Sequence, residues 1–93
     1  MPAAGVRVFL PGADPEEVEA KAARPLEALI NQIEGVDHVW SVSEDSQVTV
    51  TVQFKVGEDK EKSLVKLADR VMSGRDKLPR EAVGPFIASA DVD

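Results

Sequence analysis

The chain has 93 residues, with 17 acidic residues against 11 Lys and Arg, a formal net charge of −6 and no cysteine. This length allows one small core and leaves little room for a deep, enclosed active site, so we expect a single domain over residues 1–93. The acidic balance argues against nucleic acid as a partner, and the lack of cysteine excludes disulfides and thiolate metal sites. No apolar run approaches the ~20 residues that cross a bilayer, so we expect this stretch to be soluble.

A strand followed by a helix is predicted at the start of the chain. Residues 5–10 alternate in the manner of a strand with one buried face. Asp14, Pro15 and Glu17 then form the pattern of a capped helix start, in which a carboxylate accepts from free amides. The helix should begin at Pro15 and bury one stripe of apolar residues: Val18, Ala22, Leu26, Leu29, Ile30 and Ile33.

Two residues interrupt or end this predicted helix. Pro25 lies inside the apolar pattern, where it removes one hydrogen bond and crowds the preceding turn, so we expect a kink or a split near residues 22–24. Gly35 is expected to cap the C-terminal end.

The next segments predict a hairpin. Residues 36–43 should place Val36, His38, Trp40 and Val42 on one face, with Asp37 and its alternate neighbours on the other. The run 47–54 alternates more cleanly, with Val48, Val50, Val52 and Phe54 facing one way. One face of this pair should pack on helices, while the other meets water or another subunit.

A second helix and a last strand complete the predicted fold. The helix should run from Lys60 to about Lys77, weakened by Gly74, and the strand from Phe86 to about Asp91. The order strand, helix, strand, strand, helix, strand is that of the ferredoxin-like split βαβ fold. We therefore predict an α+β domain, with a four-stranded antiparallel sheet and two helices on one face.

No residue pattern indicates catalysis. His38 is the single histidine, so a histidine metal cluster lacks partners, and the serines have no triad around them. The sequence predicts neither an enzyme nor a cofactor or metal site. His38 and Trp40 could contact a ligand, although a partly buried sheet face is the more common reason for such residues.

The second helix carries a further line of residues beside its apolar stripe. We call it the outer stripe; its spacing of three and four places it on one side of the helix. It comprises Glu61, Val65, Asp69, Met72 and Asp76. On residue types alone this is a solvated face, flanked by Lys62, Lys66 and Arg70.

Several blocks of the sequence together resemble one family. They are V-x-V-x-L-PGADPEEVE, A-x-x-PLEALINQIEGV, V-x-SVS, VTVTVQF, G-x-D, and DKLP ahead of PFI. This pattern, over residues 6–91, resembles the first porter subdomain of resistance-nodulation-division efflux transporters, the AcrB-like pumps. One departure is the hairpin SEDSQVTV, where members of the family commonly have a glycine between the strands.

The resemblance implies a role in a larger machine. In that family the subdomain belongs to the periplasmic part of a trimeric inner-membrane pump, which exchanges protons for drugs, detergents, lipids or metal ions. The chain would act with other porter subdomains and transmembrane helices of its parent chain, and with a periplasmic adaptor protein as a further partner. It would be a structural and gating module without transport activity of its own, and residues 1–4 would be a flexible or artificial start.

The same resemblance changes the interpretation of the outer stripe. Glu61, Val65, Asp69, Met72 and Asp76 fall where the family's pore-lining helix faces the threefold axis, which implies a contact between subunits. Acids gathered on an axis repel one another unless they are screened, so the isolated chain is expected to remain monomeric. The alternative hypothesis is a free-standing ferredoxin-like domain that binds a small ligand or has a regulatory role.

Overall fold

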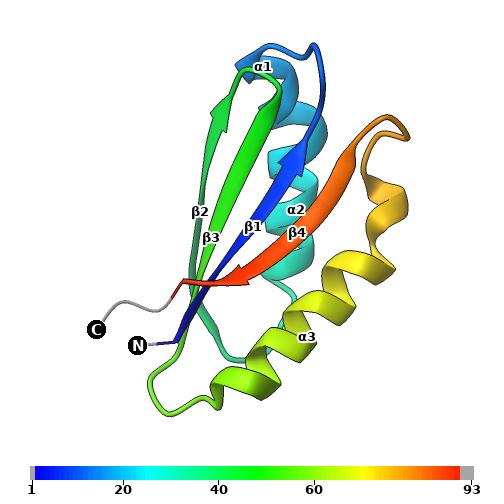
Figure 1. The fold of residues 1–93 in the computed structure, drawn as a ribbon. Helices are drawn as coiled ribbons and strands as arrows, with labels where there is room; N and C mark the ends of the chain where they lie inside the picture. Colours follow the sequence, from blue (N-terminus) through cyan, green and yellow to red (C-terminus); the bar gives the residue numbers. More distant parts are fainter. Residues whose placement is uncertain (1, 91–93) are drawn as a thin grey trace.

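The computed structural model describes residues 2–90 and has two layers, a four-stranded sheet and a helical layer that covers one of its faces (Figure 1). The elements in chain order are β1 (Ala3–Phe9), α1 (Pro15–Val18), η1 (Glu19–Ala23), α2 (Arg24–Ile30), β2 (Val36–Glu44), β3 (Gln47–Phe54), α3 (Lys60–Ser73), η2 (Arg75–Lys77) and β4 (Val83–Ser89).

The sheet has the strand order β2-β3-β1-β4, and each neighbouring pair is antiparallel. The two central strands, β1 and β3, therefore come from the two halves of the chain, which confirms the predicted ferredoxin-like fold. Alternate residues of these strands form the core with the inner sides of the helices: Ala4, Val6, Val8, Val48, Val50, Val52, Phe54, Val18, Ala22, Leu26, Ile30, Leu67 and Val71.

The start of the first helix is capped as predicted. Asp14 Oδ1 accepts a hydrogen bond from the Glu17 amide at 2.8 Å, and Glu17 Oε1 accepts one from the Asp14 amide at 3.5 Å. Pro15 occupies the first turn, where no intrahelical amide is needed.

The predicted split at Pro25 is also confirmed, and it takes the form of a π-helical turn. This turn, η1, lies directly before α2, and its last bond runs from the Arg24 amide to the Glu19 carbonyl five residues earlier. Pro25 has no amide hydrogen, and its ring would crowd the carbonyl four residues before it in a regular α-helix. The wider π turn accommodates the ring and leaves Ala22 and Ala23 buried.

The end of this helix differs from the prediction. Regular helix stops at Ile30 and Asn31 is the C-terminal cap, so the assignment of that role to Gly35 was wrong. The next amides, of Gln32 and Ile33, donate to carbonyls three residues earlier and tighten the chain into a turn. Gly35 instead has a φ of 95° at the entrance to β2, a conformation that favours glycine.

The first and last strands of the chain both begin earlier than predicted. β1 begins at Ala3, and Ala3 and Ala4 pair with β3 and are buried, so these two residues are not a flexible start. Met1 lies outside the described residues. β4 begins at Val83, so Pro85 lies within this edge strand rather than before it. The pairing of β4 with β1 shifts register in this region. The expected end at Asp91 also falls outside the described residues.

The hairpin of β2 and β3 forms with one register shift. Val36 pairs with Phe54 and His38 with Gln53, so Asp37 is an extra residue on β2. This bulge turns Val36 to the helical side with Val39, so the prediction that Val36 shares a face with His38, Trp40 and Val42 was wrong. Asp37 was expected on the other face, yet its Oδ2 lies 3.8 Å from His38 Nε2.

Helix α3 is shorter than predicted. It ends at Ser73, followed by Gly74 and the single 3₁₀ turn η2, rather than continuing to Lys77. Gly74 is buried, and a Cβ atom at this position would lie 2.5 Å from Leu29 Cδ1. The helix therefore ends where the absence of a side chain lets α2 approach closely.

Candidate functional site

The residues of the outer stripe all lie on exposed surface. Four of them are on α3, and Asp76 follows in η2. The opposite side of α3 is buried through Ser63, Leu67 and Val71. The four stripe residues on α3 are therefore exposed on a helix whose other side is buried, and Asp76 is exposed beyond the end of that helix.

Two apolar side chains interrupt this charged surface. Val65 is 68% exposed and Met72 is 56% exposed, although both are large apolar residues. They alternate with Glu61, Asp69 and Asp76 along the stripe. Val65 and Met72 can contact another protein only where the charges of the neighbouring acidic side chains are screened by salt or paired with cations.

The flanking cations do not all pair with these acids. Arg70 Nη1 donates a hydrogen bond to Gln32 Oε1 of the α2–β2 connection at 3.1 Å. Arg70 thus joins the two helical segments, and Asp69 stays exposed beside it.

Sequence reasoning missed Arg75, which organises the connection from η2 to β4. Its Nε donates to the Gly84 carbonyl at 3.0 Å, Nη1 donates to the Pro79 carbonyl at 3.3 Å, and Nη2 donates to the Ala82 carbonyl. The guanidinium presents several donors in one plane, which suits a bent loop of carbonyls. No spacing in the sequence signals this contact because the acceptors are backbone atoms.

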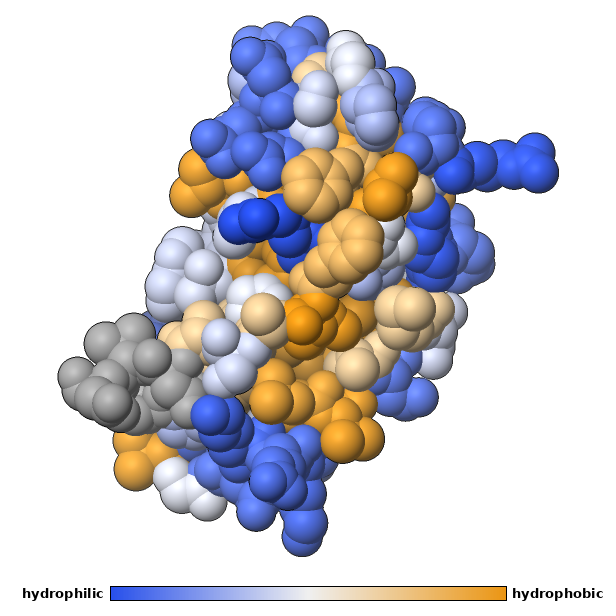
Figure 2. Space-filling model, in the orientation of Figure 1, coloured by the Kyte–Doolittle hydropathy of each residue, from blue (hydrophilic) through white to orange (hydrophobic). Residues whose placement is uncertain are grey.

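The other candidate surface is the open face of the sheet, turned away from the helices. Trp40 (47% exposed), Val42 and Phe86 (53% exposed) point out from it, and His38 lies beside them on β2. Figure 2 shows apolar side chains gathered across the middle of this face. The partly buried face that was expected here fits Trp40, about half of which is covered, whereas His38 is mostly exposed.

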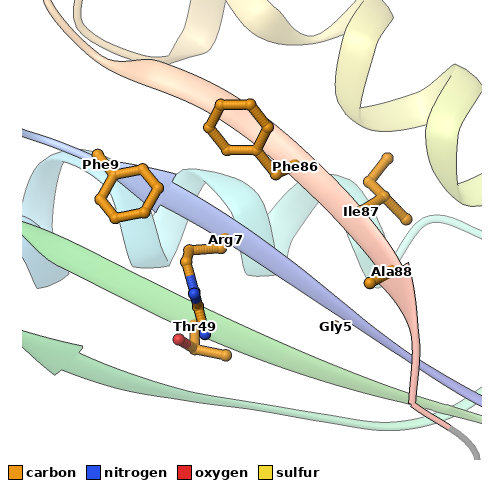
Figure 3. Close-up of a pocket in the computed structure, with 7 residues that line it drawn as sticks. All are labelled: Gly5, Arg7, Phe9, Thr49, Phe86, Ile87 and Ala88. Carbon is orange, nitrogen blue, oxygen red and sulfur yellow. The ribbon is translucent and has the colours of Figure 1, made fainter.

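A shallow hollow of about 290 Å³ lies over β1 and β4 on this face (Figure 3). Its lining consists of Gly5, Arg7, Phe9, Thr49, Phe86, Ile87 and Ala88. The rings of Phe9 and Phe86 meet edge to face with centroids 5.9 Å apart. The register that places Phe86 opposite Arg7 depends on the pairing of the chain's two ends, which the sequence pattern does not reveal.

Residues 2–90 contain neither a cluster of metal ligands nor a helix that could cross a membrane. No group of three or more His, Cys, Asp or Glu side chains there could hold a metal ion. In the same residues, no helix is both long enough and apolar enough to span a bilayer. The two candidate sites are exposed surfaces, namely the outer stripe and the open sheet face.

Comparison with known proteins gives consistent matches to transporters. The model of the AcrB/AcrD/AcrF family matches residues 1–92. The multidrug resistance protein MdtC of Serratia proteamaculans is 36% identical over 58 residues, which cover 62% of this chain and 6% of that protein. An uncharacterized transporter of Haemophilus influenzae is 29% identical over 85 residues, which cover 91% of this chain and 8% of that protein. The chain thus corresponds to a small part of the length of either relative.

Proposed function

The chain belongs to the AcrB/AcrD/AcrF family of efflux transporters, and from this we propose that it is the first porter subdomain of a proton-driven pump. The family match, which extends over nearly every residue, is the observation that carries the proposal. The small share of each relative that the chain covers agrees with one module of a much longer protein.

We further propose that this module lies in the periplasm and acts as a structural and gating element. The ferredoxin-like fold forms one core from both halves of the chain, so it can move as a rigid body within a larger assembly. Its partners would be the other porter subdomains and the transmembrane helices of the parent chain, and a periplasmic adaptor protein.

In a trimer of the parent pump, α3 would line the central pore with the outer stripe towards the axis. Support comes from the exposure of all five stripe residues and from the two apolar side chains, Val65 and Met72, among the acids. Apolar contact near the axis would hold three helices together, while solvated acids limit how closely they approach.

The location can be tested by labelling the whole transporter in cells. A single cysteine replacing the exposed Ala20 should react with a membrane-impermeant maleimide added outside the inner membrane. Since the 93 residues contain no cysteine, this region has no competing thiol. Labelling that occurs only after the inner membrane is broken would contradict a periplasmic position.

The solution mass of the 93-residue chain separates this role from a free-standing binding domain. We expect a monomer at every protein and salt concentration. Association through the outer stripe would bring the acidic side chains of several copies together, and the isolated chain lacks the rest of the pump to hold them there. A tight dimer that is unaffected by substitution of Glu61 or Asp69 would favour the free-standing domain.

A further inference from the structure

We propose that the hollow on the open sheet face binds a small amphiphilic anion, with one carboxylate or sulfonate group and an aromatic or alkyl body. The anionic group would meet Arg7 and the apolar body would lie against Phe9 and Phe86 (Figure 3). The hollow lies on the side of the sheet away from α3, so this site is separate from the outer stripe and does not depend on the proposed role in a pump.

Arg7 supplies the charge of the site. It is an exposed residue in the middle of β1, and its guanidinium has no hydrogen bond or ion pair to any residue among 2–90. The other six lining residues are uncharged, although the chain as a whole carries a net charge of −6. The net charge of the chain does not favour an anion, so binding here depends on Arg7, whose planar guanidinium can bind a carboxylate through two parallel hydrogen bonds.

Phe9 and Phe86 supply the apolar wall. They come from neighbouring strands and pack edge to face, which fixes the two rings against each other. Phe86 is nevertheless 53% exposed, so a ring or alkyl chain can still be placed against it. In Figure 3 the Arg7 side chain runs towards Thr49, away from the two rings, so the hollow matches a ligand with a charged group at one end and an apolar body at the other.

Gly5 supplies the space between these groups. Its φ is not in the positive region, so its backbone conformation does not require glycine, and a glycine inside a strand weakens the sheet. A Cβ atom built on Gly5 would meet nothing within 4 Å, which means that the space above it is open. A strand glycine without a conformational reason is typical of a position that another group approaches closely.

The test uses two fluorescent probes with the same ring system. Anilinonaphthalene sulfonate carries the anionic group, and phenylnaphthylamine lacks it. We expect saturable binding of the sulfonate at one site, with amide chemical-shift changes centred on residues 5–9 and 86–88. The neutral probe should bind about tenfold more weakly or worse, the usual scale for loss of one charge-assisted contact.

Substitutions at Arg7 and Gly5 distinguish the effect of the positive charge on binding from the effect of the open space in the hollow. Arg7→Gln should weaken sulfonate binding about tenfold and leave the neutral probe unaffected, whereas Arg7→Lys should retain most of the affinity. Gly5→Val should block both probes by filling the hollow, and a β-branched residue suits a strand, so the variant should remain folded. Circular dichroism checks the fold of each variant.

Arg24→Gln is the control, because Arg24 is also exposed but lies on α2, across the sheet from the hollow, where it pairs with Glu19. It should leave sulfonate binding unchanged. The proposal is wrong if Arg7→Gln and Arg24→Gln have the same effect, if the sulfonate does not bind, or if the shift changes centre on another surface.

Discussion

Gly12 and Ser46 are joined by a hydrogen bond in which the Gly12 amide donates to Ser46 Oγ across 3.0 Å. Two backbone bonds accompany it, from the Leu10 amide to the Ser46 carbonyl at 2.8 Å and from the Ser46 amide to the Ala13 carbonyl at 2.9 Å. The turn of the β2–β3 hairpin is therefore tied to the loop between β1 and α1. Ser46 has a φ of 64°, a left-handed backbone conformation that favours glycine.

Two substitutions of Ser46 should distinguish the contribution of its hydroxyl group to stability from the cost of its backbone conformation. Ser46→Ala loses the hydrogen bond and keeps the unfavourable φ, so it should lower the free energy of unfolding by about 1 kcal/mol. Ser46→Gly loses the same bond but removes the steric cost, so it should stay close to the unsubstituted chain. Urea denaturation measures both, and equal stability of the two variants would contradict this account.

Gly74→Ala should be destabilising for a packing reason. The added Cβ would lie 2.5 Å from Leu29 Cδ1, so the buried Leu29 side chain must repack or its helix must shift, at a cost of about 1–3 kcal/mol. Ser73→Ala, at the exposed neighbouring position, is the control and should change stability by no more than about 0.5 kcal/mol. In the double variant with Leu29→Ala the two costs should be less than additive. Full additivity in thermal or urea unfolding would show that the two sites are independent.

Arg75→Lys should destabilise the chain although the charge is kept. One ammonium group cannot reproduce the planar contacts with the carbonyls of Pro79, Ala82 and Gly84, and we expect a loss of about 2 kcal/mol. Hydrogen exchange at the Ala82 amide, which donates to the Pro79 carbonyl, should accelerate. Arg80→Lys is the exposed control. Unchanged exchange in the Arg75 variant would mean that the loop is held by other contacts.

Periodic patterns made much of this fold predictable. The alternation of Val48, Val50 and Val52 and the helical spacing of Val18, Ala22 and Leu26 depend only on near neighbours, and all six residues are buried. The capping box at Asp14 and the split before Pro25 are likewise local in origin. Interactions between near neighbours in the sequence thus made the order of the helices and strands predictable. Few compact chain topologies are compatible with that order.

The differences arise where distant residues decide the outcome. The bulge at Asp37 depends on the register with β3, and the early start of β4 depends on its pairing with β1. The hollow on the open sheet face is lined by residues from β1, β3 and β4, so its members share no spacing in the sequence. Among the lining residues, Gly5 alone could have indicated the hollow from the sequence, because a glycine inside a strand often marks a position that another group approaches closely.

The most direct test of the proposed role is cysteine cross-linking along α3 in the whole transporter, with its other cysteines replaced. We expect a short bifunctional maleimide to join subunits through Val65→Cys and Met72→Cys, because both side chains would lie near the axis. Ala20→Cys is exposed on η1 and should not be cross-linked. Cross-linking at Ala20, or at none of the three positions, would contradict the placement of α3 at the centre of a trimer.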